Sequence, residues 1–149
     1  MFLPGAKSNL YKPAISPDGR YVSYLSWERG TGATYIRPFP AGEGKWELPG
    51  SSESTVFWLK DRILFTVYSP EPALMEIPLS LAGTLALGTP RKLFDLGPRR
   101  LSTSQEGFSV SPDGHRILMV QDTEAGGEPA GVVVVENWLR EFEERTAGR

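Results

Sequence analysis

Short apolar runs separated by turn-forming residues recur along the whole chain and predict β-strands. In the most regular run, Arg20–Ser26, side chains alternate between the two faces of an extended strand. Gly131–Glu136 contains four consecutive valines and predicts a strand buried on both faces. The other expected strands are Met1–Leu3, Lys12–Ser16, Thr34–Phe39, Lys45–Leu48, Ser54–Trp58, Arg62–Tyr68, Leu74–Ile77, Arg91–Phe94, Gly107–Val110 and Ile117–Gln121.

A tight turn precedes two of these strands with the same four residues, Ser16–Gly19 and Ser111–Gly114. Proline presets φ at the first turn position, aspartate bonds nearby backbone N–H groups, and glycine takes the left-handed position. A degenerate copy, Trp58–Arg62, has lost the proline and the glycine. The residues of this structural turn motif are Pro17, Asp18, Gly19, Asp61, Pro112, Asp113 and Gly114.

The spacing of the turn aspartates indicates an internal repeat. Asp18 and Asp113 are 95 residues apart and Asp61 lies near the midpoint. Three unrelated hairpins are the alternative. Units of about 40–50 residues with four short antiparallel strands are typical of β-propeller blades. We therefore predict an all-β fold, a partial β-propeller with about three four-stranded antiparallel blades over residues 12–50, 54–97 and 106–137, in a single domain.

Two segments depart from the strand pattern. Leu79–Pro90 is expected to be an extended connection; a short helix over Leu79–Leu87 is the alternative, which the glycines there disfavour. At the chain end, Asn137 is a good N-cap and apolar residues recur on one side, which predicts a short helix over 138–145. This helix stands where the third blade would have its outer strand.

Composition supports a folded domain and narrows the function classes. The chain has 149 residues, 40% of them hydrophobic, with 16 Gly and 13 Pro, which suits many short strands joined by turns. The net charge is −2 with both signs interspersed, so no basic stripe points to nucleic acid. The absence of Cys excludes disulfides and thiolate metal sites. No apolar run is long enough for a membrane span or a signal peptide, and the sequence does not indicate a compartment.

Three segments resemble TolB-like, WD-repeat-like bacterial β-propellers. They are Ile15–Tyr24, the passage Tyr35–Pro40 followed by Lys45–Trp46, and the ending Val132–Val135 with Asn137–Leu139 and Glu141. The last two resemble a branch in which the propeller is often the C-terminal sensor or scaffold part of a bacterial serine/threonine protein kinase. Members of the parent family are often periplasmic or extracytoplasmic. No kinase signature is present in this chain, so the resemblance does not extend to kinase activity.

The number of blades departs from that family, whose propellers usually have six or more. Three blades leave two blade faces open. If each face exposes about 400–600 Å² of apolar surface, up to about 10–15 kcal/mol of burial is lost per face. We therefore expect either a fragment of a longer propeller or two copies that close into a ring.

Few residues are candidates for catalysis or metal binding. His115 follows the second turn and lacks a nucleophile outside that turn, so a catalytic role is disfavoured. Asp18 and Asp113 each supply one carboxylate, where metal loops supply several, so we expect turn capping and no metal. The acidic run Glu141, Glu143 and Glu144 is expected to be a solvated helix face.

Aromatic and basic residues offer two candidates for partner contact. The four tryptophans, Trp27, Trp46, Trp58 and Trp138, are expected mainly to fill space between blades, with Trp27 the most exposed. Arg37 would reach the central channel or a partner, or it would pair with a carboxylate on a neighbouring strand. Trp27 and Arg37 are therefore the candidate interaction residues.

The expected function is a non-enzymatic scaffold or sensor that binds a protein or peptide, with no cofactor. The alternative is the propeller portion of a larger enzyme whose catalytic domain lies elsewhere, either a bacterial serine/threonine kinase or a prolyl-oligopeptidase-like hydrolase. A small-ligand binder is a third, weaker reading.

Overall fold

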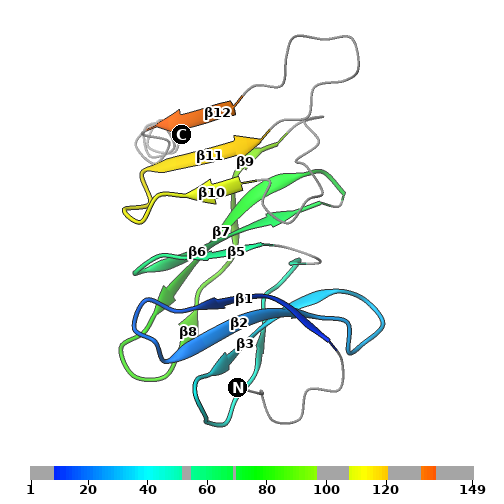
Figure 1. Cartoon of the computed structure of the whole chain (residues 1–149), viewed down its shortest axis with the longest axis vertical. Coiled ribbons are helices and arrows are strands. Elements are labelled where there is room, and N and C mark those ends of the chain that lie inside the picture. Colours follow the sequence, from blue (N-terminus) through cyan, green and yellow to red (C-terminus); the bar gives the residue numbers. More distant parts are fainter. Residues whose placement is uncertain (1–8, 52–54, 69, 97–107, 121–131, 137–149) are drawn as a thin grey trace. The chain divides into compact units, whose positions relative to one another are not determined.

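The computed structural model describes residues 9–51, 55–68, 70–96, 108–120 and 132–136 (Figure 1). These residues form twelve β-strands in three antiparallel sheets, and none of them is helical. No helix long and apolar enough to cross a membrane occurs in this part of the chain. The chain divides into two compact units, Met1–Asp95 and Leu96–Arg149. The expectation that all three sheets share one domain stays a prediction.

The first sheet contains four strands in the order β1–β2–β3–β4. Its register places Tyr24 of β2 opposite Tyr35 of β3. The pairing of β1 with β2 shifts between Tyr11 and Ala14, where Lys12 has a positive φ of 49°. The strand bounds are Leu10–Ile15 for β1, Tyr21–Ser26 for β2, Ala33–Pro38 for β3 and Trp46–Glu47 for β4.

The second sheet is built around its long strand β7, Ala73–Ser80. One edge of β7 pairs with β6 from Ala73 to Pro78. The other edge pairs with β9 from Ala73 to Glu76 and with β8 at Leu79 and Ser80. The other bounds are Val56–Trp58 for β5, Arg62–Val67 for β6, Ala86–Leu87 for β8 and Arg91–Asp95 for β9.

This sheet therefore has five strands, one more than the sequence predicted. The segment Leu79–Pro90, expected to be an extended connection, contributes the end of β7 and the whole of β8. The alternative helix over Leu79–Leu87 does not form. Leu79 and Leu85 are both buried, and the Leu79 amide donates to the Asp61 carbonyl at 2.8 Å, so tertiary contacts fix this segment.

The third sheet has the order β10–β11–β12 among the described residues. Its strands are Phe108–Val110, Arg116–Val120 and Val132–Glu136. The predicted helix 138–145 and the predicted strand Met1–Leu3 lie outside the described residues. Each of the other predicted strands overlaps an observed one.

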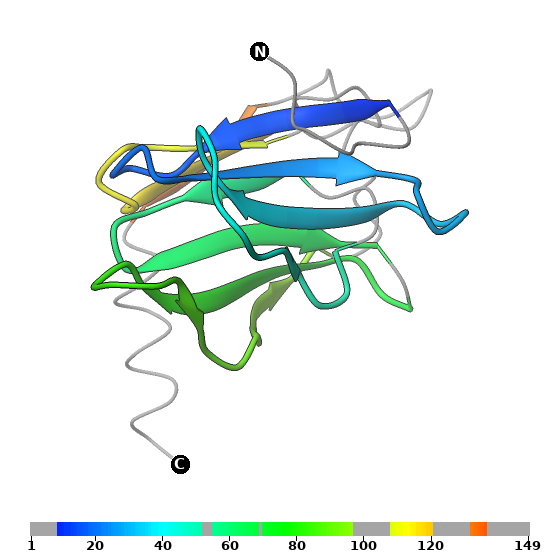
Figure 2. The ribbon, with the colours of Figure 1, turned by 90° about the horizontal axis from the view of Figure 1, so that it is seen from below.

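The main core of the first unit lies between its two sheets, which stack face to face in Figure 2. Phe65, Ile36 and Ile63 at its centre are fully buried. Trp46 and Trp58 pack against its margin, and the Trp58 indole donates to the Ser23 hydroxyl at 3.0 Å. The buried members are Tyr21, Ile36 and Leu48 with Val56, Ile63, Phe65, Ile77, Leu79 and Leu85.

Strand alternation places Glu76 of β7 on the opposite side from this core. Its side chain is only 1% exposed. One carboxylate oxygen accepts from Arg91, and the other lies 3.6 Å from the Arg62 guanidinium. Arg62 and Arg91 come from the two strands that flank β7, so the buried charge sits between two cations.

Candidate binding groove

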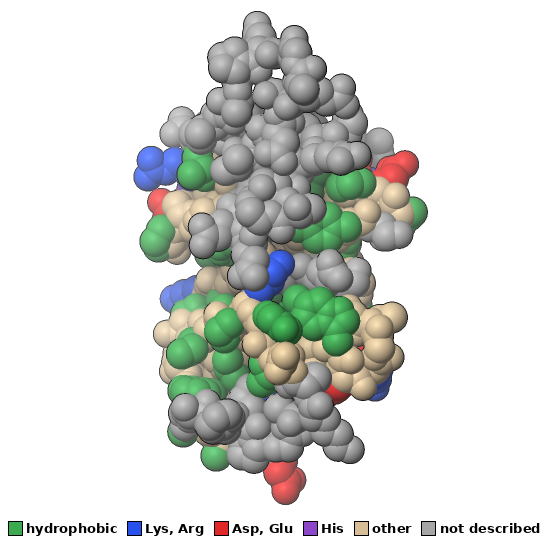
Figure 3. Space-filling view, turned by 45° about the vertical axis from the view of Figure 1, so that its right-hand side comes forward, with side chains coloured by type: hydrophobic (Ala, Val, Ile, Leu, Met, Phe, Trp, Pro, Cys, Tyr) green, Lys and Arg blue, Asp and Glu red, His purple; other side chains and the backbone are tan. Residues whose placement is uncertain are grey.

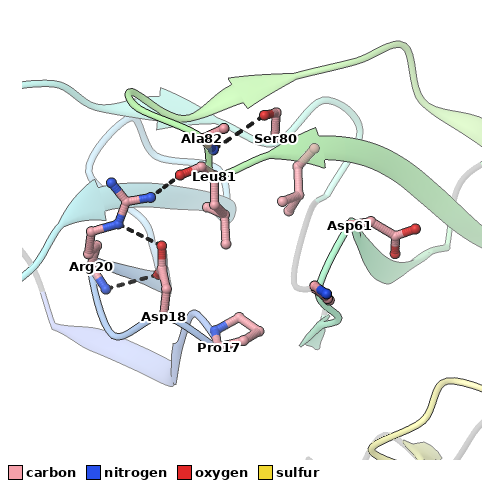
Figure 4. Close-up of a pocket in the computed structure, with 9 residues that line it drawn as sticks. Pro17, Asp18, Arg20, Asp61, Ser80, Leu81 and Ala82 are labelled. Carbon is pink, nitrogen blue, oxygen red and sulfur yellow. Dashed lines mark hydrogen bonds and ion pairs between the residues drawn. The ribbon is translucent and has the colours of Figure 1, made fainter.

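The described residues of the first unit form an open depression of about 880 Å³, which we call the groove (Figure 4). Three segments distant in sequence form it: the first turn, the β5–β6 hairpin, and the end of β7 with the loop after it. Its lining residues are Pro17, Asp18, Arg20, Lys60, Asp61, Leu79, Ser80, Leu81 and Ala82.

The first turn is held by a closed set of hydrogen bonds. The Ser16 hydroxyl donates to the Asp18 carboxylate at 2.7 Å and accepts from the Tyr21 amide at 2.9 Å. Asp18 also accepts from the Arg20 amide at 3.1 Å and from the Arg20 guanidinium at 2.6 Å. Gly19 has a φ of 73°, which favours glycine. The turn is therefore a rigid wall of the groove.

These hydrogen bonds control the charge of Asp18. Desolvation alone would raise its pKa, but the bonds from Ser16 and Arg20 outweigh this effect. They lower the pKa of Asp18 from 3.8 to about 2.

The second turn repeats this arrangement in the other unit. The Ser111 hydroxyl donates to Asp113 and accepts from the Arg116 amide at 2.9 Å. Asp113 accepts from the His115 amide at 2.9 Å, and Gly114 also has a φ of 73°. The bond from Ser111, followed by that from the His115 amide, lowers the pKa of Asp113. Pro112 completes the turn and is exposed.

The degenerate copy has a different geometry. The Leu59 amide donates to the Arg62 carbonyl at 2.8 Å, which closes a hairpin with only Lys60 and Asp61 in its loop. In the intact turn the corresponding bond joins Ser16 to Tyr21 across four residues. The Asp61 carboxylate pairs with the Arg62 guanidinium at 3.0 and 3.2 Å, and this hydrogen bond lowers its pKa. In Figure 4 it points away from Asp18 and Arg20.

Arg20 links the two sheets across the groove. Its guanidinium donates to the Leu81 carbonyl and, at 2.9 Å, to the Gly83 carbonyl, while it also pairs with Asp18. The neighbouring Tyr21 hydroxyl accepts from the Leu85 amide at 2.8 Å. The loop after β7 is thus tied to the first turn. Sequence reasoning did not single out Arg20; its position two residues after the turn aspartate is the one local signal.

The two candidate interaction residues lie outside the groove lining. Trp27 is 38% exposed and packs edge-to-face on Tyr11, with ring centroids 5.2 Å apart at 89°. Arg37 is half-buried on β3. Burial raises the pKa of Tyr24, and the charge and hydrogen bond of Arg37 oppose that rise. Other large exposed hydrophobic residues in the described part are Tyr11, Ile15, Tyr68 and Leu118, and hydrophobic and polar side chains are intermixed on the face in Figure 3.

Candidate chemistry elsewhere is sparse. His115 is exposed beside the second turn, and the Ser111 hydroxyl there donates to Asp113. No group of three potential metal ligands occurs among the residues that the structure describes. Trp138 and the acidic run Glu141, Glu143 and Glu144 lie outside them.

Comparison with solved structures identifies the fold. The chain is similar to the crystal structure of TolB from Acinetobacter baumannii, with a TM-score of 0.60 and 16% sequence identity over 91% of this chain. The matched region is 31% of that TolB chain, so this chain spans about a third of its length. No protein-family model matches the sequence. The chain therefore has an all-β, TolB-like β-propeller fold, with antiparallel sheets that resemble propeller blades.

Proposed function

We propose that this chain is a non-catalytic binding module and that its groove binds a segment of a protein partner. The observation that carries the proposal is the construction of the groove. Both sheets of the first unit contribute to it, and Arg20 fixes one wall against the other with bonds to Asp18, Leu81 and Gly83. Because these walls are pre-organised, a ligand segment would bind with little ordering of the protein.

The residues that line the groove are better suited to binding a ligand than to catalysing a reaction. Its apolar surface comes from Pro17, Leu79, Leu81 and Ala82, and charged residues stand beside them. The carboxylates of Asp18 and Asp61 are engaged in structural hydrogen bonds and not aimed at a nucleophile. Apolar surface with a few placed polar groups is typical of ligand pockets.

Selection from a library of displayed, end-blocked random octapeptides tests this proposal. We expect the 149-residue chain to enrich peptides that an unrelated protein does not. Ala82→Trp fills the groove and should weaken binding of those peptides by at least about tenfold, a loss of about 1.4 kcal/mol. The matched control Ala41→Trp adds the same ring at an exposed loop position outside the groove lining. Failure to enrich peptides, or equal loss in both variants, would contradict the proposal.

A second candidate function follows from the share of the TolB chain that this chain matches. The chain spans 31% of the TolB chain, which supports a role as the propeller portion of a larger protein. The resemblance of Arg37–Pro40 and of the Asn137–Trp138 ending to one family branch favours a bacterial serine/threonine kinase over a prolyl-oligopeptidase-like hydrolase. The DNA upstream of Met1 tests this candidate: an in-frame kinase and membrane segment support it, and a stop codon contradicts it.

A further inference from the structure

The groove offers hydrogen-bond donors, while its carboxylates are already engaged. Asp18 accepts three hydrogen bonds, one from Ser16 and two from Arg20. Asp61 accepts two from Arg62. A ligand cation would have to compete with these bonds, so the two carboxylates are poorly placed to attract one.

The cation Lys60 is placed differently. It is exposed and forms no ion pair or hydrogen bond with any residue in the described part of the chain. Arg20 pairs with Asp18 and Arg62 pairs with Asp61. Lys60 adds to the positive field that lowers the pKa of Asp61, but among the described residues it is the lining cation that forms no ion pair. The lining therefore favours an anion.

A second donor lies on β7. The Ser80 hydroxyl oxygen accepts from the Ala82 amide at 3.3 Å, which leaves the hydroxyl proton to be donated (Figure 4). Ser80 and Lys60 line the same depression, together with the aliphatic side chains of Leu79 and Leu81. A carboxylate next to an aliphatic side chain would satisfy both kinds of surface.

We infer that the groove recognises an internal acidic residue, flanked by aliphatic residues, in an extended segment of a partner protein. This inference rests on the proposed function. Lys60 supplies the charge and Ser80 a hydrogen bond to the acidic side chain. The depression is open, so the segment can continue on both sides of the bound residue. Arg20 is a positioning residue, because its guanidinium is occupied by Asp18, Leu81 and Gly83.

The same octapeptide library tests this inference through the composition of the peptides recovered. We expect Asp or Glu beside Leu, Ile or Val, and about threefold to fivefold weaker binding when that acidic residue is replaced by its amide, the effect of an exposed ion pair. Lys60→Gln should give the same loss, and binding should weaken as salt rises. Arg116→Gln is the matched control, because it removes an exposed positive charge outside the groove lining.

Reversing the charge of Lys60 is the sharpest test of this inference. Lys60→Glu should turn the selected peptides from acidic to basic. Its melting temperature should stay near that of the parent chain, because Lys60 is exposed and the substitution changes only a solvent-screened interaction with Asp61. Neutral peptides that bind the parent and Lys60→Glu equally, but not Ala82→Trp, would overturn this inference and leave the proposed function standing. Recovery of no peptide by the parent would overturn both.

Discussion

Arg20 and His115 occupy the same position in the two copies of the turn, immediately after the glycine. The turns themselves share one hydrogen-bond network, with a serine hydroxyl donating to the aspartate. They differ in what the next side chain does. Arg20 reaches two carbonyls of the loop after β7, whereas the His115 ring is exposed. The four-residue motif thus determines the conformation of both turns. The residue that follows it determines whether the turn also contacts a distant loop, as Arg20 does.

Arg20→Ala should lower the free energy of unfolding by about 1–2 kcal/mol, because it removes charge-assisted hydrogen bonds that join the two sheets. His115→Ala at the equivalent position should change it by less than about 0.5 kcal/mol. Urea unfolding followed by tryptophan fluorescence measures both. Equal effects of the two substitutions would show that Arg20 does not link the sheets.

The lowered pKa of Asp18 predicts a pH dependence. A carboxyl group with a pKa of about 2 in the folded state and 3.8 in the unfolded state stabilises the fold above pH 4. That contribution is lost as the pH falls from about 4 toward 2. Asp18→Asn should therefore cost about 1 kcal/mol at pH 6 and clearly less at pH 3. Urea unfolding at the two pH values checks this, and a constant difference between parent and variant would contradict it.

Strand β7 organises the second sheet, and its end forms part of one wall of the groove. It pairs with β6, β8 and β9, and its end carries Leu79 and Ser80 into the groove lining. Its neighbour β6 supplies Phe65 to the core between the sheets. The groove therefore depends on packing of the two sheets as well as on its own lining.

Phe65→Ala should destabilise the first unit by about 3–5 kcal/mol, because the side chain is fully buried between two sheets. Hydrogen exchange should speed up in β2 and β3 as well as in β6 and β7. Tyr68→Ala is the matched control just beyond the end of the same strand, where the ring is 42% exposed. Faster exchange confined to β6 and β7 would contradict face-to-face packing of the sheets as the source of stability.

The strands could be predicted because short apolar runs alternate with turn-forming residues along the chain. The groove could not be predicted, because residues far apart in the sequence form it. The run Arg20–Ser26 predicted β2 to within one residue. The two residues of β8 carry no such signal; the loop before them is held by the bond from the Leu85 amide to the Tyr21 hydroxyl. Arg20 and Leu81 are 61 residues apart, so nothing local indicated that they meet. Lys60 lies in a two-residue hairpin loop, and only the fold brings that loop to the depression that Leu79 also lines.

The chain has a TolB-like propeller fold and spans about a third of the length of the TolB chain that it resembles. Closed propellers bury both faces of every blade against neighbours. Three consecutive blades on their own would leave two blade faces without a neighbour. We therefore expect it to associate with itself or with further propeller blades.

Multi-angle light scattering of the purified chain tests that expectation. We predict a mass of twice the single chain, or aggregation when further blades are missing. A stable, soluble monomer at high concentration would contradict both ring closure by two copies and the need for additional blades.

Chemical-shift mapping shows whether a peptide binds in the groove. The ¹⁵N-labelled chain is titrated with an octapeptide recovered by selection, and amide shifts are followed residue by residue. We predict that the largest changes cluster at Asp18–Arg20, Lys60–Asp61 and Ser80–Ala82. Changes centred instead on Tyr11, Trp27 or Arg37, with the groove amides unmoved, would show that the peptide binds elsewhere and not in the groove.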